Sequence, residues 1–137
     1  MHDGITSIGW HTFSESELET VMLPEKLQTV SWGTFYGCSK LRFVKLNCNL
    51  KKIEGYAFLQ CEALKELVIP EGVESIGDSA FDYQHLESLY LPQSIRDIDK
   101  EPFGWIYGQT SALTIYVKAG SYAERRMREL GFPVEHY

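Results

Sequence analysis

The stretch LKKIEGYAFLQCEALKELVIP, residues 50–70, decides the fold, because the chain on both sides of it repeats the same pattern. Its aromatic residue, Phe58, recurs at steps of 22 or 23 residues, as Phe13, Phe35, Phe81 and Phe103. The position five residues earlier is always aliphatic: Ile8, Val30, Ile53, Ile76 and Ile98. Several apolar columns that keep one period indicate a solenoid of stacked repeats.

Each repeat carries too few apolar side chains to form a core alone. It buries them by stacking on the next repeat, so equivalent residues lie above one another in ladders. After the first aromatic, Val21 and Leu23 alternate with Thr20 and Met22, which predicts a short strand. A proline ends three of these strands, namely Pro24, Pro70 and Pro92, whereas Asn47 stands at the end of a fourth. Consecutive strands should therefore form a parallel sheet with about 4.8 Å between neighbours.

The pattern Leu-x-x-Ile-x-x-x-Ala-Phe-x-x-Cys-x-x-Leu-x-x-Leu-x-Ile-Pro in residues 50–70 resembles the BspA-type leucine-rich repeat. The resemblance extends over residues 5–117. It implies an α/β solenoid: a short stack of about five turns, or rungs, with one parallel sheet. It also implies a bacterial surface or secreted protein that takes part in adhesion or protein binding, and that has no enzymatic activity.

Length and composition favour one globular domain, residues 1–137, with repeats at about 5–117 and a cap at 118–137. A hydrophobic fraction of 44% excludes a disordered chain. The net charge of −6 disfavours a nucleic-acid partner, which needs a basic face. No apolar run is long enough for a membrane span, and residues 1–4 have no signal-peptide pattern. The sequence alone therefore leaves the compartment unknown.

Three cysteines cannot all pair within one chain. Cys38 and Cys61 share a column and should lie on adjacent rungs, where a disulfide is one possibility. We predict instead that both are reduced, because the column faces inward and a free cysteine behaves as a small buried hydrophobe. Cys48, between Asn47 and Asn49, is the predicted exposed thiol.

Outward strand positions can vary without disturbing the core, so they are the candidates for binding a partner. They are unusually rich in apolar and aromatic side chains, which favour protein interfaces. The alternative is that these side chains only cover the sheet or contact the C-terminal segment. The candidates are Met22, Phe43, Lys45, Glu66, Val68, Tyr90 and Tyr116.

The first rung has no strand of the repeat type before Ile5 and no capping helix. An uncapped end exposes core and strand edge. We therefore predict that it is covered by preceding sequence or by a second copy, as a homodimer. Trp10 and Trp32 share a column and should stack on neighbouring rungs, either as packing or as part of this contact. The candidates for the contact are Ile5, Ile8, Trp10, Phe13 and Trp32.

Residues 104–111 interrupt the repeat before a final predicted strand at 113–117, and form a minor candidate for ligand contact. In the cap, Ser121 and Glu124 have the spacing of a capping box, which predicts a helix that ends near Leu130. Ala123, Met127 and Leu130 should cover the last rung, and Arg125, Arg126 and Arg128 should face solvent. A short terminal strand should follow around residues 132–134.

No metal, cofactor or catalytic pattern emerges from the sequence. The four histidines share no column, and no spacing matches a zinc site or a phosphate loop. The sequence therefore predicts a non-enzymatic module that binds a protein on its exposed sheet, and a host extracellular protein is one candidate partner. The alternative is a structural role, as the C-terminal part of a longer solenoid or as a homodimerising spacer.

Overall fold

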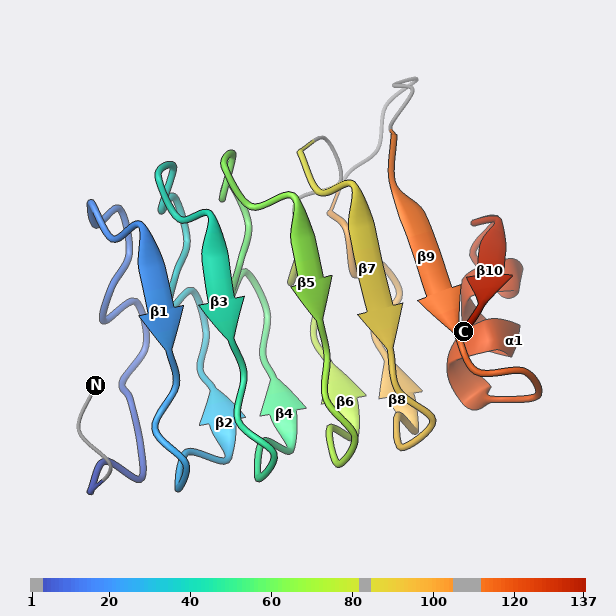
Figure 1. The fold of residues 1–137 in the computed structure, drawn as a ribbon, viewed down its shortest axis with the longest axis horizontal. Helices are drawn as coiled ribbons and strands as arrows, with labels where there is room; N and C mark the ends of the chain where they lie inside the picture. Colours follow the sequence, from blue (N-terminus) through green and yellow to red (C-terminus); the bar gives the residue numbers. More distant parts are fainter. Residues whose placement is uncertain (1–3, 82–84, 105–111) are drawn as a thin grey trace.

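The computed structural model describes residues 4–81, 85–104 and 112–137. The chain winds into a solenoid of about five turns, with long strands on one side and short strands on the other (Figure 1). The elements are β1 (Thr20–Met22), β2 (Thr29–Val30), β3 (Phe43–Lys45), β4 (Lys52–Ile53), β5 (Glu66–Val68), β6 (Ser75–Ile76), β7 (Ser88–Leu91), β8 (Asp97–Ile98), β9 (Thr114–Val117), α1 (Tyr122–Glu129) and β10 (Val134–His136). The predicted parallel solenoid with a helix near its C-terminal end is confirmed.

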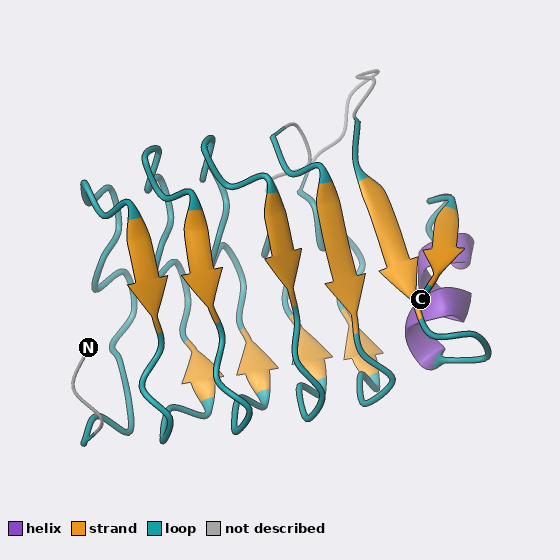
Figure 2. Cartoon of the chain, in the orientation of Figure 1, coloured by secondary structure: helices purple, strands orange, loops and turns teal. Residues whose placement is uncertain are grey.

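The strands lie in two layers. The front sheet comprises β1, β3, β5, β7, β9 and β10, and the rear sheet comprises β2, β4, β6 and β8 in that order (Figure 2). Every pair is parallel, and the strands of the repeats pair in register with the sequence repeat, so that Leu67 lies opposite Leu89 and Ile53 opposite Ile76. The rear sheet has strands of two residues, which the expectation of one parallel sheet did not include.

The front sheet is divided between β3 and β5. These strands are neighbours in the stack (Figure 1), yet β1–β3 and β5–β7–β9–β10 are separate hydrogen-bonded groups. The rear sheet is continuous at the same level, because β4 pairs with both β2 and β6. The sequence predicted one parallel sheet, and the structure divides it at this level.

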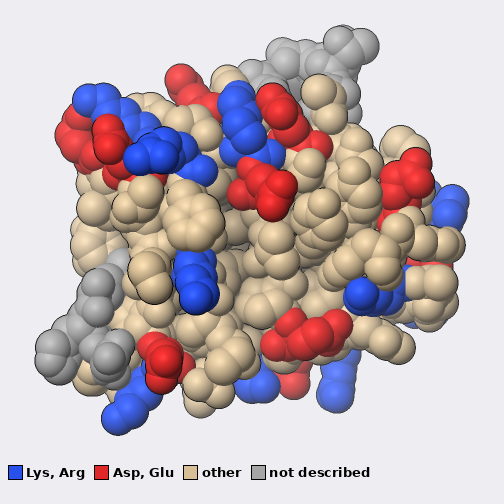
Figure 3. Space-filling model, viewed as in Figure 1, with Lys and Arg blue, Asp and Glu red and all other residues tan. Residues whose placement is uncertain are grey.

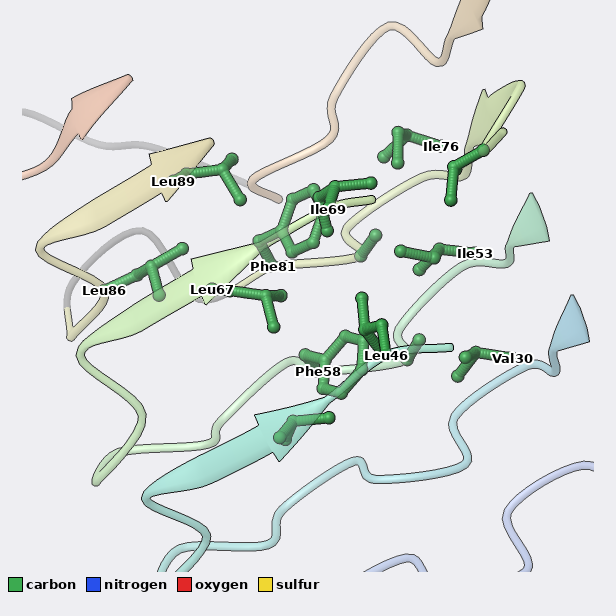
Figure 4. Close-up of a cluster of buried hydrophobic side chains, with 14 of the residues drawn as sticks. Val30, Leu46, Ile53, Phe58, Leu67, Ile69, Ile76, Phe81, Leu86 and Leu89 are labelled. Carbon is green, nitrogen blue, oxygen red and sulfur yellow. The ribbon is translucent and has the colours of Figure 1, made fainter. Parts of the chain in front are cut away.

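Side chains from both sheets meet in one core between the layers (Figure 4). The repeated columns fill it as predicted: Leu50, Ile53 and Phe58 are each at most 1% exposed. The aromatic column forms part of a stack, with ring centroids 5.4 Å apart between Phe35 and Phe58 and nearly parallel planes. Phe103 is closed off at the far end by Phe132, whose ring meets it edge-on at 4.9 Å. Burial of these ladders is the main stabilising contribution to the solenoid.

The cysteines lie where the sequence placed them. Cys38 and Cys61 are buried free thiols, and Cys48 is exposed. Each buried thiol donates a hydrogen bond to a carbonyl of the preceding rung, from Cys38 Sγ to Phe13 O at 3.0 Å and from Cys61 Sγ to Phe35 O at 3.2 Å. The cysteine column therefore provides hydrogen-bond donors to backbone carbonyls and also fills space in the core.

Asn47 takes the place that proline holds in three other repeats, and its side chain is buried. Nδ2 donates to the carbonyls of Pro24 at 2.6 Å and Leu27 at 2.9 Å, and Oδ1 accepts from the backbone N–H of Asn49 at 2.8 Å. One side chain thus forms hydrogen bonds with backbone groups at the corner of its own rung and at the corner of the preceding rung.

Asn47→Ala is expected to lower the free energy of unfolding by about 1–2 kcal/mol, since buried carbonyls lose their donors. Asn47→Pro, which restores the repeat pattern, is also expected to destabilise the protein for the same reason. Urea unfolding measures both. Asn49→Ala is the matched control, because its side chain lies at the surface and should matter by less than about 0.5 kcal/mol. A gain of stability in Asn47→Pro would contradict the assigned role.

The helix α1 closes the C-terminal end as predicted, with Ala123 and Met127 buried against the last rung. Its C-terminus has the paired bonds of a Schellman motif, from Gly131 N to Arg128 O and from Phe132 N to Met127 O. The strand β10 then pairs with β9, so the expected terminal strand is present slightly later than predicted.

Two details of the cap differ from the prediction. Ser121 Oγ accepts from Glu124 N at 3.1 Å, but the Glu124 carboxylate returns to the N–H of Gly120 rather than to that of Ser121. Arg126 is not solvated like Arg125, because Nε donates to Ile98 O at 3.3 Å and ties the helix to β8. The predicted loop at 104–111 lies, apart from Gly104, outside the described residues.

Glu124 should make the cap sensitive to acid. Hydrogen bonds from His136, Gly120 and Arg128 lower the pKa of its carboxyl from 4.5 to about 2. A pKa lowered by folding contributes stability that is complete above pH 4.5 and is lost as the pH falls toward 2.

We expect the urea midpoint of the wild type to fall more steeply between pH 4.5 and pH 2 than that of Glu124→Gln. Glu129→Gln, which alters an exposed carboxylate on the same helix, serves as the control and should follow the wild type. Parallel curves for the wild type and Glu124→Gln would show that this carboxylate does not couple to folding.

Candidate binding surfaces

The outward positions of the front sheet form one surface, here called the front face. Pairing aligns Thr20 with Phe43, and Val68 with Tyr90. In β1, β3 and β5 the middle residue is buried and its two neighbours are exposed, as the alternation predicted. Uncharged residues cover most of this face, with isolated Lys or Arg side chains at mid-height, and most charged residues lie toward its upper and lower edges (Figure 3).

Three large apolar side chains stand out on the front face. Met22, Phe43 and Val68 are 61%, 51% and 52% exposed, respectively. Lys45 and Glu66 are exposed beside them on β3 and β5. Exposed side chains of this size on consecutive strands form an apolar area with charged neighbours, the composition typical of a contact with another protein.

Tyr90 and Tyr116 are also on the front face, but they are half-buried. Their rings stack with centroids 4.4 Å apart and planes 8° from parallel. The C-terminal Tyr137 meets Tyr90 edge-on at 5.2 Å and donates its hydroxyl to Leu91 O at 3.1 Å. The C-terminal segment thus covers this end of the face, which was the alternative left open by the sequence.

Tyr137 and Lys118 extend this aromatic cluster, although the sequence pattern did not identify them. The Lys118 ammonium lies 3.7 Å from the Tyr137 ring centroid. Desolvation raises the pKa of the Tyr90 hydroxyl, with further contributions from Tyr116 and Glu66. The Tyr90 hydroxyl is therefore neutral at physiological pH. Neither added residue belongs to a repeat column, so periodicity could not have revealed them.

The first rung is open, as its pattern indicated. Ile8 and Phe13 are only half-buried, whereas the equivalent Val30 and Phe35 are at most 1% exposed. Ile5 is half-buried as well. β1 pairs only with β3 and leaves its other edge unpaired by any strand among the described residues. The apolar end and the free edge lie together at the N-terminal end of the stack (Figure 1).

The predicted stacking of Trp10 on Trp32 is wrong. Trp10 is 74% exposed and has no ring contact within the part of the chain that the structure describes. Trp32 packs instead on Tyr56 of the next rung, with centroids 4.9 Å apart. Its ring lies against Gly55, where an added Cβ would come within 2.8 Å of the indole. Because Gly55 has no side chain, the indole of Trp32 has room to pack against the third rung.

Across residues 4–81, 85–104 and 112–137, no group of three or more His, Cys, Asp or Glu side chains is placed to hold a metal ion. Within the same ranges, no helix is both long and apolar enough to cross a membrane.

Solved structures with the same architecture exist. A leucine-rich repeat protein from T. pallidum matches 80% of this chain at 26% identity, with a TM-score of 0.72. A leucine-rich repeat protein from Bacteroides ovatus matches the whole chain at 19% identity, with a TM-score of 0.63. This chain corresponds to 50% and 47% of those chains, respectively, so it spans about half of their length. A search of curated proteins gave no match.

The sequence was also compared with models of protein families. The model described as "BspA type Leucine rich repeat region" matches residues 1–107 in six copies. These residues include the repeats that build both sheets up to β8. The chain therefore belongs to the BspA-type leucine-rich repeat family.

Proposed function

We propose that this protein is a non-enzymatic module that binds another protein on its front face. The observation that carries the proposal is the exposure of Met22, Phe43 and Val68 on three consecutive strands of the front face, β1, β3 and β5. Because the backbone of these strands is fixed by the stack, binding costs little conformational entropy. Lys45 and Glu66 then supply charge complementarity and orientation.

Family membership supports a binding role rather than catalysis, since leucine-rich repeats present extended surfaces. An adhesive role at a bacterial surface is the finer form of the proposal. Its partner is then an extracellular protein, such as one from a host. Tyr90 and Tyr116 contribute through their exposed edges.

The test uses a partner identified by pull-down from host extracellular proteins and then purified. The double variant Phe43→Ala/Val68→Ala should weaken binding by at least about tenfold, as expected when central apolar contacts are lost. Trp10→Ala removes a still more exposed aromatic side chain away from the front face and should bind like the wild type. Unchanged affinity of the double variant, or an equal loss in both, would contradict the proposal. Thermal unfolding verifies that each variant is folded.

A second candidate function is structural, with the first rung joining this chain to a second copy. The half-burial of Ile8 and Phe13, beside the unpaired edge of β1, favours it. Trp10 and Ile5 lie at the same end, whereas Trp32 faces the third rung. Sedimentation should then reveal a dimer that Phe13→Ser dissociates, with Phe43→Ala as the control. A monomer at all concentrations would exclude this candidate.

A further inference from the structure

A shallow groove of about 210 Å³ lies over the rear sheet, on the side of the solenoid opposite to the front face. Its lining includes residues of β4, β6 and β8. These strands lie on consecutive rungs (Figure 1). Gly55 and Gly77 both line it. Because neither has a side chain, the neighbouring atoms approach closely: the Trp32 indole lies against Gly55, and the backbone of Gly55 lies against Gly77. The residues that line the groove include one exposed aromatic, four carboxylates and one lysine: Trp32, Glu54, Asp78, Asp97, Asp99 and Lys52.

Trp32 is held in place as an exposed aromatic platform. Its indole is supported by the ring of Tyr56, at 4.9 Å and 41°, and the residue is 39% exposed. Its backbone N–H donates to Glu54 Oε2 at 3.1 Å, which fixes a carboxylate beside the aromatic residue. A partly exposed indole next to fixed negative charge is the arrangement that attracts a cation.

The charge of the groove is unbalanced. Lys52 is the one cationic side chain that lines it, against four carboxylates. Asp99 Oδ1 accepts a backbone N–H, that of Lys100, at 2.6 Å. Asp78 and Asp97 take part in no ion pair within the described ranges. The two carboxylates are therefore available to a positive group from outside.

We propose that this groove binds an arginine side chain from a basic segment of a protein partner. Its volume is below the roughly 300 Å³ at which pockets for drug-sized ligands begin, so it suits one side chain rather than a larger molecule. A guanidinium group stacks on an indole and forms forked hydrogen bonds to carboxylates, and an ammonium group does neither as well. The complementarity of charge and of flat surfaces selects arginine.

The probe is a capped tetra-arginine peptide, titrated into the ¹⁵N-labelled protein at low salt. The indole N–H of Trp32 and the amides of Gly55 and Gly77 should shift, and the indole of Trp10 should not. Trp32→Ala should weaken binding about three- to tenfold. Asp78→Asn/Asp97→Asn should weaken it at least about tenfold and reduce its dependence on salt. Phe43→Ala, on the opposite face, should leave it unchanged.

Tetra-citrulline, which keeps the shape and removes the charge, is the matched peptide control and should not bind. The proposal is overturned if both peptides bind alike, or if shifts spread over the acidic surface without a focus at Trp32. It is equally overturned if cellotetraose shifts the Trp32 indole and tetra-arginine does not, since the groove then selects a carbohydrate. The aspartate variant keeps Trp32 in place, so the test does not depend on the folding of Trp32→Ala.

Discussion

Phe58→Ala is expected to lower the free energy of unfolding by about 3–5 kcal/mol, the range of buried aromatic truncations. Phe58 is 1% exposed and stacks on Phe35 at 5.4 Å. Its backbone also forms an isolated parallel β-bridge with that of Phe81 in the next rung. Both side chains lie in the core (Figure 4). Because each rung depends on its neighbours, a cavity here weakens the interfaces on both sides. The total free energy of unfolding of a natural domain is only about 5–15 kcal/mol, so the expected loss is a large part of it.

Phe43→Ala is the matched control, because it removes the same side chain from the outward side of the same solenoid. Phe43 is 51% exposed, and its loss should change the free energy of unfolding by less than about 0.5 kcal/mol. Urea unfolding, followed by circular dichroism, compares the two variants. An equal loss from both would mean that the inward and outward faces are wrongly assigned, and the proposed binding surface would fall with them.

The sequence predicted the core well because the core is periodic. Leu50 and Ile53 each belong to a column that recurs in every rung, and stacking forces a whole column to the same side. One correct assignment therefore settled four or five positions together. The alternation that buries Val44 and exposes Phe43 follows from strand geometry alone.

Contacts outside the repeat could not be predicted in this way. Tyr137 reaches Leu91 across 46 residues, and Arg126 reaches the carbonyl of Ile98 across 28. Neither contact has a counterpart in another rung, so no period signals it. The same limit applies to the groove at Trp32, whose form depends on how the third rung packs rather than on its column.

Backbone conformation shows a further limit. His11, Tyr56 and Ser79 share a column with Gly33, and all four have φ between 51° and 59°. Of these four, only Gly33 is a residue type that predicts a left-handed conformation. The other three adopt it because adjacent rungs hold the turn in one shape through backbone bonds, such as Tyr56 N to Asp78 O at 3.0 Å. The column appears variable in sequence although its geometry is constant.

Gly77 is the position at which the third and fourth rungs come closest in the rear sheet. Its N–H donates to Ile53 O at 2.8 Å. A Cβ added here would lie 2.5 Å from Gly55 N and 2.8 Å from the carbonyl carbon of Glu54. Both neighbours are backbone atoms, so no side chain can rotate away. The same column holds Glu54 one rung earlier, which shows that the requirement for glycine belongs to this one interface.

Gly77→Ala is therefore expected to lower the free energy of unfolding by about 3 kcal/mol, at the upper end of the usual cost of overpacking. Gly9→Ala is the matched control from the same column, because its Cβ would meet only the Thr12 hydroxyl at 3.5 Å, an ordinary contact. It should change stability by less than about 0.5 kcal/mol. Urea midpoints measure both, and hydrogen exchange at residue 77 should accelerate in Gly77→Ala as the bond to Ile53 weakens. If Gly77→Ala were as stable as Gly9→Ala, the close approach of β4 and β6 would be wrong, and so would the groove built on it.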